Sequence, residues 1–244
     1  MTAVSVRDVW MEYDGQIILE RISLEVKPHS FVAIVGPSGC GKSTFLRLVL
    51  GQEQATKGQI LVDGKQVAKE PNVERGIVFQ RYSVFPHLTA LENVLLGLEF
   101  ARAPLLAKLT GKARAEARAE AATYLEGVGL KEAADKYPHQ LSGGMRQRLA
   151  LAQALIKKPK ILLLDEPFGA LDPGIRSDVH ALTQKLWRER AMTVFMVSHD
   201  LKEAFTLATR VIALDRRRNR PEEVGAYGAT VTFDIDVHRS AKAP

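Results

Sequence analysis

Apolar and polar residues alternate along several stretches of the chain. Residues 4–6, 22–26 and 230–237 place apolar side chains at every second position. This period of two is typical of strands that bury one face. A turn at residues 13–15 separates the first two runs, and residues 60–65 read as a strand with a hairpin turn. We therefore expect antiparallel strands near the start of the chain and a further strand near residue 230.

Continuous apolar runs predict a second kind of strand, buried on both faces. Such runs occupy residues 31–35, 161–165, 193–197 and 211–214, and residues 76–80 form one that ends in a polar residue. A parallel sheet covered by helices on both sides requires this pattern. The segments between these runs have helical character, and the alternation of strands and helices predicts an α/β fold with right-handed crossovers.

A mostly helical segment interrupts this alternation from residue 86 to about residue 143. Residues 89–92, Thr-Ala-Leu-Glu, form a capping box that opens a helix predicted through Leu98. Residues 112–126 are rich in Ala, Arg and Glu and predict another helix, and residues 131–136 predict a short one. Residues 101–118 resemble a solvent-exposed connection more than a part of the core.

Composition limits the possible classes of protein. The chain has 244 residues, of which 46% are hydrophobic and 25% charged, as expected of a globular protein with a sizeable core. No apolar run of about 18 residues and no secretory signal is visible, and the single cysteine, Cys40, excludes a disulfide framework and a multi-cysteine metal site. We therefore expect a cytosolic protein.

The formal net charge of +6 leaves contact with nucleic acid open as one interpretation. The densest basic runs, residues 157–160 and 216–220, have no interleaved aromatic residues. This composition favours solvated turns, or contact with a phospholipid surface or an acidic partner, over specific nucleic-acid binding.

A glycine-rich loop between an apolar strand and a helix is the first chemical motif. It matches the pattern G-x-x-x-x-G-K-[ST] of a phosphate-binding P-loop. Glycines allow successive amides to point inward, and the helix start adds free amides and a positive dipole end. Lys42 can reach the β- and γ-phosphates, and the Ser43 hydroxyl can ligate Mg²⁺. The candidate nucleotide-binding residues are Gly36, Pro37, Ser38, Gly39, Cys40, Gly41, Lys42, Ser43 and Thr44.

The strand and the helix beside this loop favour a P-loop over the alternative, a glycine turn that opens an ordinary helix. The fold class is accordingly a P-loop NTPase (RecA-like) parallel sheet core with an antiparallel β subdomain and a helical insert. The predicted boundaries are residues 1–85 for the first part of a nucleotide-binding core, 86–143 for a helical subdomain, and 144–244 for the second part of the core.

Two acidic residues, Asp165 and Glu166, end an apolar strand. In open α/β sheets, ligands lie at the carboxyl ends of the strands. Asp165 is therefore placed to hold Mg²⁺ next to Ser43, and Glu166 to polarise an attacking water as a general base. The alternative is that both carboxylates only cap the turn before Pro167.

Two more polar residues lie at strand ends, and each is a weak signal by itself. The carboxamide of Gln80 can bind Mg²⁺ and orient water, and the imidazole of His199 can bond a γ-phosphate oxygen. Polar strand ends are common, however, and a lone histidine more often belongs to the surface or to the core.

A second candidate phosphate-binding helix start follows at Leu141-Ser142-Gly143-Gly144. One triphosphate does not need two such ends from the same chain. We therefore expect this one to serve the γ-phosphate of a nucleotide held by another subunit.

These motifs, in this order and spacing, resemble the ATP-binding subunit of an ATP-binding cassette (ABC) transporter from about residue 3 to residue 215. The resemblance identifies Gln80, Asp172 and His199 as its Q-loop, D-loop and H-loop residues, and Tyr13 as an aromatic residue that stacks on adenine. Met145 departs from the signature, where glutamine is more common, but importers often vary at this position.

The resemblance implies a head-to-tail dimer that holds two ATP molecules, with Mg²⁺, between the P-loop and the signature helix. Binding closes this dimer and hydrolysis reopens it. Lys42, Gln80, Glu166 and His199 are then the catalytic residues, and Ser43, Gln80 and Asp165 the metal-binding residues. The implied activity is ATP hydrolysis coupled to transport.

The implied partners are a paired ATPase subunit, identical or different, and transmembrane permease subunits. A coupling helix of the permease is expected in the groove around residues 81–98, for which plain core packing is the alternative. A periplasmic or lipid-anchored solute-binding protein would be an indirect partner. The expected location is peripheral, at the cytoplasmic face of the inner (plasma) membrane.

The type of transporter is open at this point. Residues 72–80 resemble nitrate, sulfonate and taurine importer subunits, whereas residues 85–89 resemble polyamine and ferric-ion importers. The latter usually carry a long C-terminal regulatory domain, so the short segment after His199 favours the first group. A urea- or amide-related importer is an equal alternative.

Two other function classes compete with the importer. The first is a soluble, non-transport cassette ATPase that acts on nucleic acid or ribosomes, but such proteins typically have two cassettes or a long coiled coil. The second is a nucleotide-dependent switch without turnover, and the intact Lys42, Asp165, Glu166 and His199 argue against it. We also expect the pKa of the Cys40 thiol to be lowered near a helix start, with inert packing against the sheet as the alternative.

Overall fold

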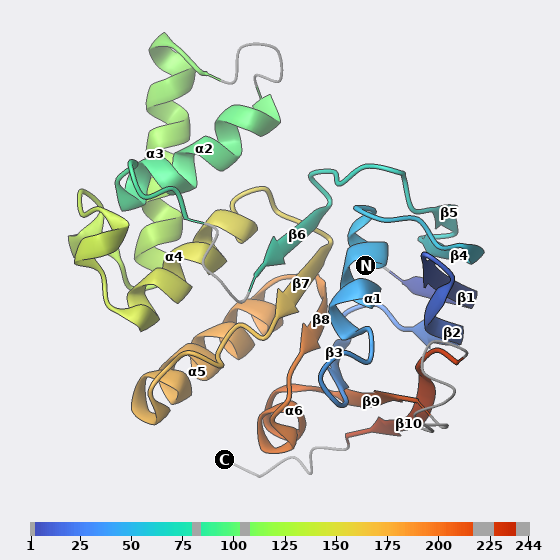
Figure 1. Cartoon of the computed structure of the whole chain (residues 1–244). Coiled ribbons are helices and arrows are strands. Elements are labelled where there is room, and N and C mark those ends of the chain that lie inside the picture. The colour runs from blue at the N-terminus through green and yellow to red at the C-terminus, as the bar shows by residue number, and fades with distance from the viewer. Residues whose placement is uncertain (1–2, 80–83, 103–107, 217–226, 238–244) are drawn as a thin grey trace.

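The described part of the chain contains two β-sheets with one helix between them and further helices on the outer face of the larger sheet (Figure 1). A computed structural model describes residues 3–79, 84–102, 108–216 and 227–237. Within these ranges, no helix has the length and apolar character that a membrane crossing requires.

The smaller sheet is antiparallel, with the strand order β2-β1-β4-β5. Its strands are β1 (Val4–Tyr13), β2 (Gln16–Val26), β4 (Lys57–Val62) and β5 (Lys65–Gln66). The tight turn between β1 and β2 is possible because Asp14 and Gly15 both adopt positive φ angles, of 48° and 79°. The antiparallel strands expected from the period-two pattern are confirmed.

The larger sheet has six strands in the order β10-β9-β3-β8-β7-β6. These are β10 (Thr230–Asp236), β9 (Arg210–Asp215), β3 (Phe31–Val35), β8 (Thr193–Val197), β7 (Ile161–Asp165) and β6 (Arg75–Val78). Neighbouring strands are parallel from β9 to β6, and β10 joins the edge in the antiparallel direction. Every residue of β3 and β8 is buried, which explains their uninterrupted apolar sequences.

Each face of the larger sheet has its own hydrophobic core. Helix α1 (Lys42–Leu50) packs in the core shared with the antiparallel sheet and ends at Gly51, which adopts a φ of 82°. On the opposite face lie α4 (Gly143–Leu155), α5 (Pro173–Glu189) and α6 (Leu201–Leu207) (Figure 1). The carboxyl ends of β3, β7 and β8 therefore open onto one edge between these layers.

The helical segment lies at one side of the molecule, away from the antiparallel sheet (Figure 1). It contains α2 (Ala90–Arg102), α3 (Gly111–Gly127) and two 3₁₀ turns at Lys131–Ala133 and Pro138–Gln140. The predicted capping box is confirmed, because the Thr89 amide donates to Glu92 over 2.9 Å and the Glu92 amide donates to the Thr89 hydroxyl over 3.3 Å. The domain boundaries around this segment stay a prediction.

Two local expectations in this segment need correction. Residues 111–118 belong to α3 and bury Ala117 completely, so they are not only an exposed connection. The short helix expected at residues 131–136 is a single 3₁₀ turn. Part of the expected connection, residues 103–107, lies outside the described residues.

Candidate functional site

The loop between β3 and α1 depends on glycine at two positions. A Cβ atom on Gly36 would lie 2.0 Å from the backbone oxygen of Leu214, and one on Gly41 would lie 2.8 Å from the Leu19 side chain. Gly41 also adopts a φ of 93°. Because glycine has no side chain at these two positions, the loop can fold tightly over the start of α1.

Lys42, the first residue of α1, has its ammonium group inside this loop. Its side chain is only 6% exposed, and Nζ donates to the carbonyl oxygens of Gly36 over 2.8 Å and Pro37 over 2.7 Å. An ammonium group has three donors, and a buried one needs such partners. The loop thus holds a positive charge where a phosphate group would lie.

Ser43 and Asp165 bring two oxygen ligands together from different elements. The Ser43 hydroxyl, in the first turn of α1, donates to Oδ1 of Asp165 at the carboxyl end of β7 over 3.0 Å. Burial raises the pKa of the Asp165 carboxyl, and the Ser43 hydrogen bond opposes that effect.

The Ser43 hydroxyl and the Asp165 carboxyl fit a Mg²⁺ site that is completed by water and substrate phosphates. They do not make up a site in which every metal ligand comes from the protein. Mg²⁺ prefers oxygen ligands, and it usually takes one or two carboxylates together with water and substrate phosphates. In the described part of the chain, no group of three or more His, Cys, Asp or Glu side chains could hold a metal ion.

Glu166 and His199 meet at the ends of the neighbouring strands β7 and β8. Glu166 Oε2 lies 3.4 Å from His199 Nδ1, and the His199 side chain is 63% exposed. Glu166 adopts a φ of 45°, and its amide donates to the carbonyl oxygen of Val197 over 3.1 Å. The left-handed backbone turns the carboxylate out of the line of β7 and toward the site.

A cavity of about 290 Å³ connects the P-loop with the candidate base and the candidate adenine-stacking residue. Its lining residues are Tyr13, Ile18, Ser38, Gly39, Gly41, Lys42, Ser43, Thr44 and Glu166. The Tyr13 hydroxyl donates to Glu53, whose carboxylate also pairs with Arg47 over 3.1 Å. Burial and the bond to Glu53 raise the pKa of Tyr13. Sequence reasoning did not identify Glu53, because no local pattern links it to a residue 40 positions earlier.

Cys40 does not behave as the sequence suggested. Its side chain is only 4% exposed and packs in the core between the two sheets. Burial raises the pKa of the Cys40 thiol, so the expectation of a lowered pKa is wrong. Packing outweighs the nearby Lys42 ammonium and the helix start, both of which favour the thiolate.

The signature residues lie at the start of α4, and the D-loop residue Asp172 lies at the start of α5. Ser142 is the N-cap of α4, and its hydroxyl accepts from the Met145 amide over 3.3 Å. Asp172 is the N-cap of α5, although its side chain makes no capping hydrogen bond. Ser142, Gly143, Gly144 and Asp172 are absent from the cavity lining. Gln80, the remaining candidate, lies outside the described residues.

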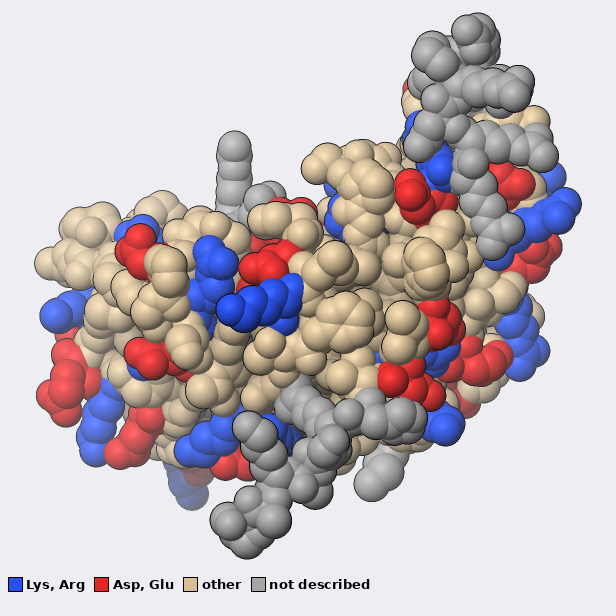
Figure 2. All heavy atoms as spheres, turned by 90° about the horizontal axis from the view of Figure 1, so that it is seen from below, with Lys and Arg blue, Asp and Glu red and all other residues tan. Residues whose placement is uncertain are grey.

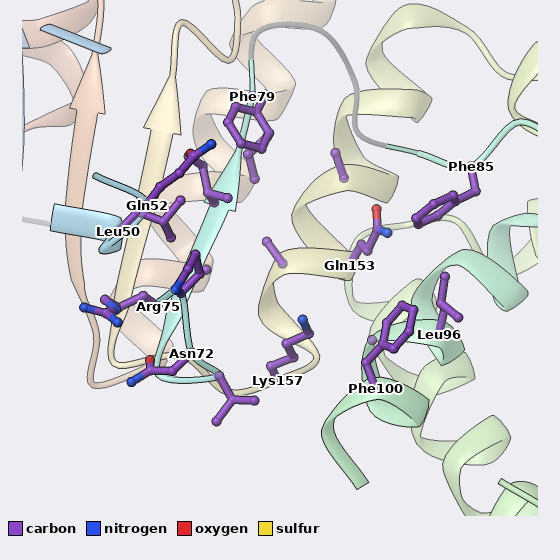
Figure 3. A pocket seen from close by; sticks show the side chains of 18 residues that line it. Leu50, Gln52, Asn72, Arg75, Phe79, Phe85, Leu96, Phe100, Gln153 and Lys157 are labelled. Atoms are coloured by element: carbon purple, nitrogen blue, oxygen red, sulfur yellow. The ribbon is translucent and has the colours of Figure 1, made fainter. Parts of the chain in front are cut away.

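A second, larger cavity of about 610 Å³ lies between β6, α2 and α4 (Figure 3). Phe79, Phe85 and Phe100 contribute aromatic rings to it, with Gln153 and Lys157 on the side of α4 (Figure 3). Phe85 and Phe100 are among the exposed large hydrophobic side chains. An apolar groove with a few polar groups is typical of a binding surface.

A family profile described as ABC transporter matches residues 19–169. This chain belongs to that family. It is an ABC ATPase, with ATP as its substrate and Mg²⁺ as its metal cofactor, and it has the P-loop NTPase fold expected from its sequence.

Two curated relatives and one solved structure illustrate the similarity. The chain is 44% identical to the aliphatic sulfonates import ATP-binding protein of Cupriavidus necator, over 93% of this chain and 73% of that protein. It is 42% identical to the spermidine/putrescine import ATP-binding protein of Spiroplasma citri, over 87% of this chain and 59% of that protein. A dimeric ATP-binding cassette in a post-hydrolysis state, bound to ADP and Pi, is 31% identical and superposes with a TM-score of 0.78, covering 97% of this chain and 99% of that one. The sulfonate importer confirms the resemblance to the first importer group, and the polyamine importer shows that the solute class is not resolved.

Proposed function

We propose that this ABC ATPase is the motor subunit of an importer, and that two subunits hydrolyse ATP at a head-to-tail interface. One observation carries the proposal: the nucleotide cavity contains the P-loop and Glu166 but none of the signature residues of the same chain. The helix start at Ser142 is therefore available to a nucleotide on a paired subunit, identical or different. The neighbouring dimeric cassette bound to ADP and Pi supports such a pairing.

Each side chain around the cavity has a chemical role in this proposal. The ring of Tyr13 stacks on the base, and Lys42 exchanges its bonds to the loop for bonds to the β- and γ-phosphates. Ser43 and Asp165, with Gln80 as a further ligand, would hold Mg²⁺, which would neutralise phosphate charge. Ser142 and Asp172 belong to the interface with the paired subunit.

Glu166 is the general base. Its carboxylate accepts a proton from the water that attacks the γ-phosphorus, and a bond then forms between that water oxygen and phosphorus as the bond to the bridging oxygen of ADP breaks. His199, 3.4 Å away, donates a hydrogen bond to a γ-phosphate oxygen and fixes the orientation of Glu166.

The second cavity supports a membrane partner. Its exposed aromatic rings fit a short apolar helix of a permease subunit, which would place this protein at the cytoplasmic face of the membrane (Figure 3). On the face that Figure 2 shows, basic and acidic side chains are interspersed and not gathered by sign, which gives no support on that face to a nucleic-acid-binding ATPase.

The proposed solutes are of the nitrate, sulfonate and taurine type, with urea or amides as the alternative. A periplasmic or lipid-anchored solute-binding protein would deliver them to the permease. The named relatives support import in general more strongly than any one solute.

Glu166→Gln tests the motor proposal. It keeps the shape of the side chain but removes the base, so turnover should fall roughly 10²- to 10⁴-fold while ATP binding survives. Because hydrolysis reopens the dimer, the variant should shift from monomer to dimer on size exclusion with ATP and not with ADP. Adding Ser142→Arg should reverse this shift, because a bulky side chain then enters the interface.

Glu189→Gln, a change of the same charge on the exposed surface of α5, is the matched control and should behave as wild type. The assay should be repeated with the permease subunits present, because isolated subunits can dimerise weakly. Wild-type turnover in Glu166→Gln would refute the assignment of the base. Retained ATP binding without closure in either setting would refute the head-to-tail interface.

A further inference from the structure

A buried polar network includes Ser198 and Asp200, the two neighbours of His199 in the chain. Its centre is Glu203 on α6, which is only 8% exposed. Glu203 Oε1 lies 2.9 Å from Nε2 of His180 on α5, and Oε2 accepts from the hydroxyl of Ser198 over 2.5 Å. Each oxygen of this carboxylate thus has a partner, which a buried carboxylate requires.

Ser198 carries the effect of this network to the neighbouring residue. Its side chain is almost completely buried at the end of β8, and its amide donates to the carbonyl oxygen of Ile34 over 3.1 Å. The Ser198 hydroxyl donates to Glu203 and accepts from the Asp200 amide over 3.0 Å. The backbone on both sides of His199 is therefore fixed by one hydroxyl group whose orientation Glu203 sets.

His180 connects the same network to the strand end that carries Glu166. Its ring packs edge-on against Phe168, with the ring centroids 4.6 Å apart, and Phe168 is completely buried two residues after Glu166. One turn earlier on α5, Arg176 pairs with Asp200 over 3.8 Å. Helix α5 thus supports both members of the pair formed by Glu166 and His199.

We propose that Glu203, held by His180, is a positioning residue that sets the orientation of His199 for ATP hydrolysis. The proposal rests on the role of His199 given above. A buried pair of hydrogen-bonded polar side chains contributes little to stability compared with apolar packing of the same volume, so its value lies in fixing one geometry. Loss of Glu203 removes the short bond of the Ser198 hydroxyl and leaves only its longer bond to the Asp200 carbonyl oxygen, at 3.4 Å, so the turn at His199 is held less firmly.

A double-mutant cycle in the full chain tests this role. Glu203→Ala should lower kcat for ATP roughly 10- to 100-fold, by analogy with the loss of a residue that orients a metal-binding side chain through a hydrogen bond. The Kd for ATP, measured with a fluorescent ATP analogue, should change less than about 3-fold because the P-loop is untouched. If Glu203 acts through His199, adding Glu203→Ala to His199→Ala should lower kcat no further.

Glu203→Gln should restore most of the activity, because its amide oxygen can accept from Ser198 and its amide nitrogen can donate to His180. Ser198→Ala breaks the connection at its other end and should reproduce the loss of kcat, which guards against a Glu203→Ala variant that does not fold. Lys202→Ala, on the exposed side of the same helix, is the matched control and should keep the wild-type kcat.

The outcomes separate this role from the proposed function. If His199→Ala lowers kcat but Glu203→Ala adds its full effect to it, Glu203 is merely structural and the inference is wrong. The same conclusion follows if Glu203→Ala and Ser198→Ala both fold and turn over ATP at the wild-type rate. If His199→Ala itself has the wild-type kcat, the role of His199 in the proposed function falls, and the inference falls with it.

Discussion

A methyl group at Gly144 would test how closely the signature helix must approach α5. A Cβ atom there would lie 2.2 Å from Cγ2 of Ile175, whereas carbon atoms in contact prefer 3.5 to 4.0 Å. Gly174, near the start of α5, provides a matched control, because no heavy atom lies within 4 Å of the corresponding Cβ position. The two glycine-to-alanine changes thus differ mainly in the space around the new methyl group.

The expected free energies follow from this difference. Replacing glycine by alanine at a compatible helical position stabilises a protein by about 0.4–1 kcal/mol, and we expect this gain for Gly174→Ala. At Gly144 the same gain is opposed by overpacking, which costs about 1–3 kcal/mol. The two variants should therefore differ in stability by about 1–3 kcal/mol, or by roughly 2–12 °C in melting temperature for a domain of this size.

Thermal unfolding followed by circular dichroism measures this difference, and the Glu166→Gln background adds a functional measurement. Gly144→Ala should melt below Gly174→Ala and should weaken ATP-dependent dimer formation, because the start of α4 is displaced. Ile175→Ala removes Cγ2 and leaves Cβ at 3.7 Å, an ordinary contact, so it should relieve the overpacking in the double variant. Equal melting temperatures for the two alanine variants, or no relief by Ile175→Ala, would refute the reasoning.

Two further predictions follow from the raised pKa values in and beside the P-loop. Because burial raises the pKa of the Cys40 thiol, alkylation at pH 8 should be slow with or without MgATP; mass spectrometry that finds rapid labelling of the folded protein would contradict this. The Asp165 carboxyl, whose pKa is raised by burial, keeps its proton to a higher pH in the folded than in the unfolded chain, so stability falls as pH rises from the ordinary value of 3.8 through the folded pKa. Above that pH range the ionised Asp165 carboxylate lowers the stability of the folded protein by its full amount. Asp165→Asn should therefore raise the melting temperature of the nucleotide-free protein at pH 7.5 and abolish the further stabilisation by MgATP. A lower melting temperature of the nucleotide-free variant would contradict the direction of this effect.

Much of the fold could be predicted because the signals are local. The limits of α1 follow from the strand before it and from Gly51 after it, and the start of α2 follows from a capping box within four residues. The buried parallel strands are visible as uninterrupted apolar runs. The antiparallel direction of β10 is not visible, because strand direction depends on how the chain returns to the sheet.

The residues of the candidate site likewise fall into those that a local motif predicts and those that only tertiary packing places. The position of Lys42 and Ser43 beside the cavity could be predicted because a motif fixes their spacing, and that of Asp165 next to Ser43 because it ends an apolar strand. The orientation of the Cys40 side chain depends on tertiary packing, which no motif records. Glu203 and His180 are 23 positions apart, and only the packing of α6 against the sheet beside α5 brings them within hydrogen-bond distance.

The two carbonyl groups that accept hydrogen bonds from the Lys42 ammonium also bear on the release of phosphate from the site. An ATPase must release its products after each turnover. A lysine ammonium group with no other hydrogen-bond partner would bind phosphate more tightly and slow this release. The carbonyl oxygens of Gly36 and Pro37 accept hydrogen bonds from the Lys42 ammonium and can replace the phosphate as its partners. The exchange is nearly balanced in hydrogen bonds, so the net contribution of Lys42 to nucleotide affinity is limited.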